Sequence, residues 1–548
     1  MSKKYLIIDS FVDEPACLGV PPFISPYPRY ISGALICAGV YQDNIKYITI
    51  DSVRNNDYKI IETYEIIFII GGAIVPGKYL GSRIGTQTEI RKIIEENKRL
   101  NFALGGMISQ IIDDDNLSNL ISIKGDIEKF AYYYTKGEIT DSKRDYEDIA
   151  RWAPLGSSIV KEHPDYPDVI CEIETSRGCP RTAHCSFCSE SITNSLEFRE
   201  EDDILNEIDE LIKDGVSRFR LGRQADILAY KTKFSEFRQG FPKPEIAPIK
   251  NILTHLKAKR ESGQIKILNI DNANPGTIHN FPDESSKILE YISDAVTPGE
   301  TLALGIESLD PNVINMNNLK VNRDGFINVI KIINSIGSKR IEGIPCLLPG
   351  INLIHGLLGE STDTFKINYQ TLIEIKDSDL LIKRINIRKA LPFPGTLLYK
   401  SNRVVSKKII NRYEYYKERI RKEIDNFMLK QIYPVGTILK DTLVEDTRFD
   451  YSYAKQIASY SITAKIPVLL EKRKFLDVIV AGHRERSVIA LPLPISINTL
   501  PEKAIDTIPG VDKRGAANII LNRPFKDITH LKDIAPNIDK SIYKNIII

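Results

Sequence analysis

The sequence predicts an α/β protein of several domains, with parallel sheets in its first 400 residues and a small β domain and short helices beyond them. Strand-like and helix-like segments alternate over residues 4–110 and, with longer spacings, over residues 168–400. Such alternation is typical of β-α-β units, which form parallel sheets or barrels. Residues 433–497 are rich in β-branched residues and lack long helical periods, as expected of a small β barrel.

Length and composition restrict the class of protein. A chain of 548 residues exceeds the usual size of one domain, and 42% hydrophobic with 27% charged residues is typical of a soluble protein with a sizeable core. A net charge of +2 excludes a surface that is basic all over, and seven cysteines, an odd number, argue against a disulfide scaffold. We expect a cytoplasmic protein, because residues 1–9 enter a strand at once and the longest apolar run, 66–75, is too short to span a membrane.

Residues 1–125 are expected to form a Rossmann-like parallel sheet. The predicted strands are Lys4–Asp9, Ile45–Asp51, Ile66–Gly72 and Asn101–Gly106, and the predicted helices are Tyr30–Gly39 and Glu89–Leu100. Residues 126–165 are polar and are expected to be a linker, with one further strand at Ile127–Tyr134. Ligands of such sheets bind at the carboxyl ends of the strands, so the glycine-rich segment 71–81 is either a ligand loop or an ordinary turn.

Three cysteines, Cys179, Cys185 and Cys188, lie within ten residues of one another, directly after a predicted strand. Thiolates are soft ligands, and three on one loop can hold three irons of a cubane iron–sulfur cluster or three corners of a zinc site. The nearest fourth candidate is His184, whereas Cys171 lies inside the strand and is expected to be a core residue. A site with three protein ligands keeps one metal position open, which indicates catalysis, because structural metal sites are normally closed by four ligands.

The segments T-S-R-G-C-P and C-S-F-C around these cysteines resemble the cluster loop of the radical S-adenosylmethionine (SAM) superfamily. The resemblance implies that Cys179, Cys185 and Cys188 bind a 4Fe–4S cluster whose fourth iron binds SAM. Five residues separate the first two cysteines, where the family usually has three. A zinc site completed by His184 is the alternative.

Further motifs follow at the ends of predicted strands, where barrel folds carry their chemistry. The predicted strands are 168–175, 218–221, 265–270, 301–306, 351–355 and 383–389. The resemblance implies six SAM-binding residues at these ends: Gly222, Arg223 and Gln224 for the methionine amine, Glu307 and Ser308 for the ribose, and Arg388 beside adenine. His355 ends the fifth strand and is either a core residue or a functional one, and Glu360 is either part of the motif or an acid at a helix start.

A parallel α/β domain ahead of such a barrel resembles the cobalamin-binding domain of many relatives. Residues 1–125 contain no histidine. A histidine-ligated cobalamin is therefore excluded, whereas a cobalamin bound without a protein ligand remains open.

Two later regions indicate nucleic-acid contact. Residues 401–432 carry lysines and arginines at helical spacing, interleaved with aromatic residues; this pattern fits a phosphate-contacting stripe or a solvated helix face. Residues 498–548 resemble a helix-hairpin-helix, with Gly510 in the hairpin and Lys513 and Arg514 at the start of the next helix. Such modules usually contact nucleic-acid backbones, and a docking module for protein is the alternative.

The whole chain thus resembles an archaeal type of radical SAM enzyme. The implied domains are a cobalamin-binding-like domain (1–125), a linker (126–165), a partial (β/α) radical SAM barrel (166–400), a basic helical segment (401–432), a TRAM- or OB-like β domain (433–497) and a helix-hairpin-helix (498–548). The implied reaction is reductive cleavage of SAM to a 5′-deoxyadenosyl radical for C–H functionalisation of RNA or DNA, with a ferredoxin- or flavodoxin-type electron donor and no membrane partner. The alternatives are a radical SAM enzyme that acts on a protein or small molecule, and a non-enzymatic, zinc-stabilised nucleic-acid-binding protein.

Overall fold

The computed structural model describes residues 3–14, 17–72, 82–112, 117–458 and 461–548. The chain divides into two compact units. The first unit comprises Met1–Pro180, Thr193–Lys233 and Glu245–Asn272, and the second comprises Arg181–Ile192, Phe234–Pro244 and Ala273–Ile548. Part of the predicted segment 71–81 lies outside the described residues.

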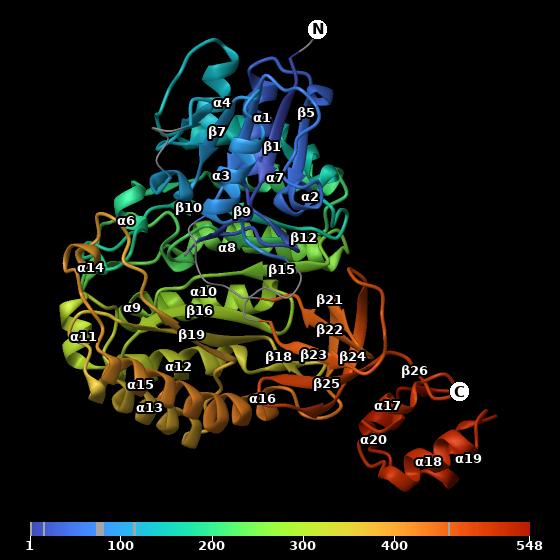
Figure 1. The fold of residues 1–548 in the computed structure, drawn as a ribbon. Helices are drawn as coiled ribbons and strands as arrows, with labels where there is room; N and C mark the ends of the chain where they lie inside the picture. Colours follow the sequence, from blue (N-terminus) through green and yellow to red (C-terminus); the bar gives the residue numbers. More distant parts are fainter. Residues whose placement is uncertain (1–2, 15–16, 73–81, 113–116, 459–460) are drawn as a thin grey trace. The chain divides into compact units, whose positions relative to one another are not determined.

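The first unit begins with a five-stranded parallel sheet of order β5-β1-β6-β7-β8 (Figure 1). Its strands are β1 (Tyr5–Asp9), β5 (Ile45–Thr49), β6 (Ile66–Ile70), β7 (Phe102–Gly105) and β8 (Leu120–Ser122). Every residue of the central strand β6 is buried and apolar, as expected of a parallel sheet covered on both faces. The predicted Rossmann-like sheet is confirmed, and so are helices α1 (Tyr27–Cys37) and α3 (Gln87–Glu96).

The strand predicted over 127–134 is wrong. These residues form helix α4 (Ile127–Thr135), because Ile127, Phe130 and Ala131 have helical spacing and are buried on one face. Helix α5 (Tyr146–Leu155) follows and begins at a capping box formed by Asp145 and Asp148. The segment expected to be a linker therefore contains two helices, and both pack on α1.

A second parallel sheet of the first unit has the order β15-β12-β9-β4. Its strands are β4 (Phe23–Ile24), β9 (Ile170–Glu174), β12 (Arg218–Gly222) and β15 (Ile267–Ile270), and helices α7 (Glu201–Lys213) and α8 (Ile246–Glu261) connect the last three. Strands β9, β12 and β15 and helix α7 agree with the prediction, whereas β4 was not predicted.

One buried carboxylate joins three elements of this unit. Glu207 on α7 accepts hydrogen bonds from Arg29 of α1 (Nη2 to Oε1, 2.9 Å) and from Arg199 (Nη1 to Oε2, 2.6 Å), and all three side chains are fully buried. The same guanidinium groups donate to strand β9, to the carbonyl oxygens of Glu172 (2.6 Å) and Glu174 (3.1 Å). Helices α1 and α7 and strand β9 are thereby held in one hydrogen-bonded arrangement.

The second unit contains a parallel sheet of order β16-β19-β20. Its strands are β16 (Glu300–Glu307), β19 (Leu347–His355) and β20 (Arg384–Lys389), and its helices include α9 (Pro275–Asn280), α10 (Pro282–Ala295), α11 (Pro311–Met316), α12 (Arg323–Gly337) and α13 (Thr362–Asp377). All three strands were predicted, although β19 begins four residues earlier than expected.

The β domain is a closed barrel of order β21-β22-β23-β25-β24. Its strands are β21 (Ile438–Arg448), β22 (Tyr451–Gln456), β23 (Thr463–Ile466), β24 (Phe475–His483) and β25 (Ser487–Pro492). The predicted small barrel is confirmed. The chain then forms helices α17 (Glu502–Ile505), α18 (Lys513–Leu521), α19 (Ile528–Ile534) and α20 (Lys540–Tyr543).

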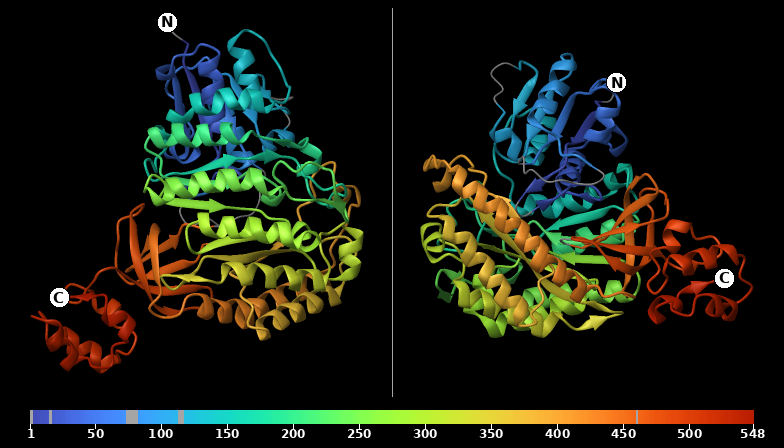
Figure 2. Two further views of the ribbon diagram at one scale, coloured as in Figure 1. Left: turned by 180° about the vertical axis from the view of Figure 1, so that it is seen from behind. Right: turned by 60° about the horizontal axis from the view of Figure 1, so that its bottom comes forward.

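The basic segment before the barrel is helical, as predicted. It consists of α14 (Leu397–Lys400), α15 (Lys407–Arg419), a π-helical turn (Ile420–Asp425) and α16 (Asn426–Ile432). Helix α15 packs against α13 (Figure 2). Across the described ranges, the structure has no helix that combines the length and the apolar character needed to span a bilayer.

The crossing of α1 and α5 supplies a stability prediction. A Cβ atom at Gly33 of α1 would lie 1.8 Å from the Trp152 carbonyl oxygen of α5, so Gly33→Ala forces the two helices apart. We expect a loss of about 3 kcal/mol and a fall of several degrees in the midpoint of thermal unfolding, followed by circular dichroism. Gly482→Ala is the matched control, because its new Cβ would meet no atom closer than 3.9 Å. Equal midpoints for the two variants would contradict the prediction.

Candidate functional site

The loop that carries the cysteines is anchored within the second unit through Ser186. Its backbone N–H donates to the Asn317 carbonyl (3.1 Å), its hydroxyl donates to Asn317 Oδ1 (2.6 Å), and its carbonyl accepts from the Leu398 N–H (2.9 Å). Phe187 packs on an apolar cluster formed by Val313, Leu319, Leu357 and Leu398. Cys185 and Cys188 lie on either side of these anchors, in a tight turn closed by the Cys188 N–H and the Cys185 carbonyl (3.2 Å).

The five residues between the first two cysteines contain a second anchor. The Thr182 N–H donates to the Gly240 carbonyl (3.1 Å), in the hairpin formed by β13 (Phe237–Arg238) and β14 (Phe241–Pro242). The Arg181 guanidinium stacks over the Phe241 ring at 4.6 Å from its centroid. The same group donates to the Asn318 carbonyl (3.0 Å) and to Cys185 Sγ (3.2 Å). The longer spacing therefore brings a guanidinium to one of the predicted ligands.

Cys179 belongs to the first unit and follows strand β10 (Ser176–Arg177). The turn between them needs Gly178, which has φ +79° and lies so close to the Ser195 carbonyl that a Cβ would approach it to 2.6 Å. Cys171 is fully buried in β9, as expected, and burial raises the pKa of its thiol to about 12. It is a core residue and not a ligand.

The described residues bring no three His, Cys, Asp or Glu side chains together in the arrangement of a metal site. The donor set nevertheless suits an iron–sulfur cluster in type and number, since three partly exposed thiols lie on one loop. Arg181 is 6% exposed, and the side-chain contacts found for it in the described structure include no carboxylate. The Arg181 cation lies next to Cys185, where a bound cluster would place the negative charge of its thiolates and sulfides. The residues present therefore fit the group.

Gln224 was predicted to contact SAM, but its side-chain amide forms hydrogen bonds within the first unit. Its Oε1 accepts from Thr175 Oγ1 (3.0 Å), and its Nε2 donates to the carbonyls of Leu221 (3.1 Å) and Asp271 (2.6 Å). The amide thus ties together the carboxyl ends of β9, β12 and β15. The Gln224 carbonyl accepts from Asn272 Nδ2 (3.1 Å), and a Cβ at Gly222 would lie 1.9 Å from Glu172 Oε1.

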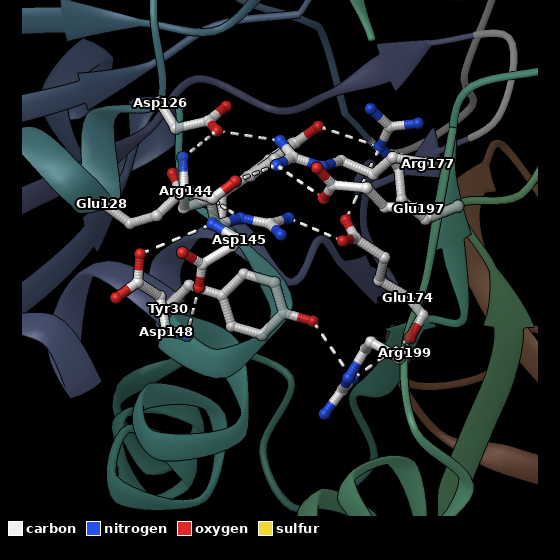
Figure 3. A network of polar contacts seen from close by, with 12 residues as sticks. Tyr30, Asp126, Glu128, Arg144, Asp145, Asp148, Glu174, Arg177, Glu197 and Arg199 are labelled. Atoms are coloured by element: carbon white, nitrogen blue, oxygen red, sulfur yellow. Dashed lines mark hydrogen bonds and ion pairs between the residues drawn. The ribbon is translucent and has the colours of Figure 1, made fainter. Parts of the chain in front are cut away.

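A network of arginines and carboxylates surrounds the end of β9 (Figure 3). Arg144 bridges Glu128 and Glu174, each at 2.6 Å, and Arg177 pairs with Asp126 at 2.8 Å. Burial by itself raises the pKa of Glu174, but the nearby Arg144 and other arginines lower it below its usual range. This network was not predicted from the sequence, because residues 126–165 were expected to be a linker.

Arg223, another predicted SAM contact, lies beside this network. It has φ +51°, donates to the Tyr27 hydroxyl (3.2 Å) and lies 3.9 Å from Glu174. Arg177 and Arg223 line a cavity of about 80 Å³ in the first unit, together with Ile70 and Gly106 near the carboxyl ends of β6 and β7.

Glu307, a predicted ribose contact, ends strand β16 with φ +59° and is buried. Both of its carboxylate oxygens accept from Lys320 Nζ (2.8 and 2.9 Å), which also donates to the Gly305 carbonyl (2.9 Å). Burial lowers the pKa of Lys320, but Glu307 and Cys185 raise it, and the pKa is raised overall. The hydroxyl of Ser308 accepts from the Asp310 N–H (3.3 Å). Lys320 was not predicted from the sequence, because it lies outside the motifs.

The other residues of the β16-β19-β20 sheet that were considered as site residues differ in exposure. Arg388, near the end of β20, is exposed. His355 is buried, lies 3.1 Å from Glu360 through Nδ1 and stacks on Phe365 at 4.8 Å between ring centroids. These contacts favour the core interpretation of His355. Glu360 accepts from the Gly356 N–H (3.1 Å) and so closes the turn before α13.

The two regions predicted to bind nucleic acid, the basic helix and the C-terminal hairpin, differ in the exposure of their side chains. Tyr413 and Tyr416 of α15 are buried, so these interleaved aromatics belong to the core. In the hairpin, Gly510 has φ +86° and packs so closely on Asn537 that a Cβ would lie 1.7 Å from its carbonyl oxygen. Lys513 and Arg514 are exposed in the first turn of α18.

Two relatives match almost the whole chain. An uncharacterized protein of Methanocaldococcus jannaschii is 39% identical over 89% of this chain and 93% of its own length. An uncharacterized protein of Archaeoglobus fulgidus is 35% identical over 97% of both chains.

Among solved structures, the radical SAM methyltransferase TsrM from Kitasatospora setae, with cobalamin and a [4Fe-4S] cluster bound, is similar at a TM-score of 0.47 and 12% identity, over 73% of this chain and 74% of that one. The cobalamin-dependent radical SAM enzyme OxsB is similar at a TM-score of 0.45 and 15% identity, over 76% of this chain and 56% of that one.

The sequence model of the radical SAM superfamily matches residues 173–356. This range begins in β9, includes the three-cysteine loop and the Glu307 turn, and ends directly after β19. The chain therefore contains a radical SAM domain over these residues.

Proposed function

We propose that this enzyme holds a 4Fe–4S cluster on Cys179, Cys185 and Cys188 and uses it to cleave SAM. The observation that carries the proposal is the three-thiol loop, anchored through Ser186 and with the buried Arg181 guanidinium 3.2 Å from Cys185 Sγ. The cluster, when bound, supplies the electron that cleaves SAM into methionine and a 5′-deoxyadenosyl radical. The contribution of the chain is to bind and orient SAM and to exclude water from it.

Glu307 is our candidate for the ribose of SAM. A carboxylate has about four acceptor positions, so Glu307 can accept from ribose hydroxyls while it remains bonded to Lys320. Lys320 offsets the cost of burying this charge and fixes the direction in which the carboxylate points. Ser308 follows directly and can donate or accept a further hydrogen bond.

For the substrate we propose a nucleic acid, bound through its phosphates by the C-terminal helices. The support is the pair of exposed cations Lys513 and Arg514 at the start of α18, next to the Gly510 hairpin. Helix N-termini favour phosphate, because their backbone N–H groups are unsatisfied. The buried tyrosines of α15 weaken the case for the basic helix.

Residues 1–125 contain no histidine that could bind cobalt, so a cobalamin in the first unit would be bound without a histidine ligand. The cavity near the ends of β6 and β7 has about 80 Å³ as the described residues form it. We assign no step to cobalamin.

The cluster proposal predicts which cysteines matter. We expect anaerobically reconstituted protein to hold about four irons per chain and to form 5′-deoxyadenosine from SAM with dithionite. Cys185→Ala and Cys188→Ala should lose both properties, because each removes one thiolate ligand. Cys37→Ala, which changes a partly exposed cysteine of α1, is the control and should keep both. Bound zinc without 5′-deoxyadenosine in the wild-type protein would contradict the proposal.

The ribose assignment predicts weaker SAM binding when the charge of Glu307 is removed. Glu307→Gln should raise the dissociation constant for SAM about tenfold, because hydrogen bonds to a charged group are the stronger ones. Equilibrium dialysis with reconstituted protein measures it. Glu374→Gln, at a partly exposed partner of Arg323, is the control for the same chemical change. Unchanged SAM affinity of Glu307→Gln would remove Glu307 from the site.

The substrate proposal predicts a change in salt dependence. The double variant Lys513→Gln/Arg514→Gln should weaken binding to single-stranded RNA and reduce the slope of log K against log salt concentration by about 1.4, since each phosphate contact contributes about 0.7. Fluorescence anisotropy of a labelled oligonucleotide measures both. Lys98→Gln/Arg99→Gln changes an equally exposed Lys-Arg pair and should leave the slope unchanged. Equal slopes for the two variants would favour a docking role for the C-terminal helices.

A further inference from the structure

Arg181 is a buried cation that the contacts found in the described structure do not balance. Its side chain is 6% exposed, and its Nε atom has no hydrogen-bond partner there. Its contacts are the Phe241 ring, the Asn318 carbonyl and Cys185 Sγ. Three fully buried arginines elsewhere in the chain each form an ion pair with a glutamate: Arg29, Arg144 and Arg199.

Burying an unpaired charge is costly, and proteins normally pair or neutralise it. An arginine cannot lose its proton in a protein, so Arg181 needs an anion. Cys185 Sγ lies 3.2 Å from Nη1, and as a cluster ligand it would carry negative charge. Lys320, whose ammonium group is paired with Glu307 at 2.8 Å, also interacts electrostatically with Cys185 and Arg181.

We propose that Arg181 is a positioning residue that raises the reduction potential of the cluster, through an N–H···S hydrogen bond to Cys185 and a positive charge beside it. The inference rests on the proposed function, because it requires Cys185 to be a cluster ligand. Hydrogen bonds to the sulfurs and the local charge both set cluster potentials. Reduction adds one negative charge to the cluster, and a nearby cation stabilises the reduced form more than the oxidised form.

The long spacing between Cys179 and Cys185 is what makes this contact available. Arg181 lies within the five-residue insertion, and the backbone hydrogen bond from Thr182 to Gly240 (3.1 Å) fixes that insertion on the β13–β14 hairpin. The Cζ atom of Arg181 then lies over the Phe241 ring, 4.6 Å from the ring centroid. Arg181 Nη1 donates one N–H to the Asn318 carbonyl, and its other N–H is directed at Cys185 Sγ.

The test is a redox titration of reconstituted full-length protein, with titanium(III) citrate as reductant and electron paramagnetic resonance to quantify the reduced cluster. Arg181→Gln should lower the ratio of reduced to oxidised cluster about tenfold at a fixed potential, which for one electron is a shift of about 59 mV. Arg181→Lys keeps the charge and should shift the ratio less. Arg238→Gln is the matched control, because Arg238 also stacks on an aromatic ring, at 4.8 Å from Phe281, and donates to a carbonyl, that of Asn280 at 3.0 Å.

The outcomes separate the two proposals. A wild-type protein that assembles no iron–sulfur cluster overturns the proposed function and this inference with it. A wild-type cluster whose potential is the same in Arg181→Gln overturns the inference alone. If Arg181→Gln fails to incorporate iron, the lysine variant decides: a potential equal to that of the wild type overturns the hydrogen bond as the cause, and a potential below that of the wild type supports it.

Discussion

Buried charge must be paired, and this constraint determines how the first unit is built. Glu207 accepts from Arg29 and Arg199, and the same arginines donate to the backbone of β9. Removing one partner of such a buried pair typically costs about 3–5 kcal/mol, because the other charge is left uncompensated. The position of strand β9 relative to α1 and α7 depends on these ion pairs. Strand β9 in turn leads into the cysteine loop.

The same constraint explains the chemistry at the end of that strand. Arg144, between Glu128 and Glu174, keeps the end of β9 attached to α4, and Gln224 joins it to β12 and β15. These groups pair with one another and connect the strand ends, although Arg144 Nη1 and Glu174 Oε2 have no hydrogen-bond partner among the described residues.

Much of this could be predicted from the sequence, because strands of parallel sheets are continuous apolar runs and cysteine spacing is local information. The helix at 127–135 could not be separated from a strand, because its three consecutive tyrosines favour strands while few residues, Ile127, Phe130 and Ala131, show the helical spacing. Residues 126–165 were predicted to be a linker because they are polar, but some of their charged residues are buried, as Arg144 is. Lys320 and Arg181 depend on tertiary contacts, which no spacing in the sequence reports.

The distribution of thiols has a consequence for how the protein acquires iron. Cys17, Cys171 and Cys346 are buried, whereas the three loop cysteines are partly exposed. Burial raises the pKa of Cys17 and Cys171, so these sulfurs stay protonated and do not bind metal at neutral pH. The apoprotein therefore distinguishes the loop sulfurs from the buried ones by access. The fold of the apoprotein thus determines which cysteines can bind iron before any cluster is inserted.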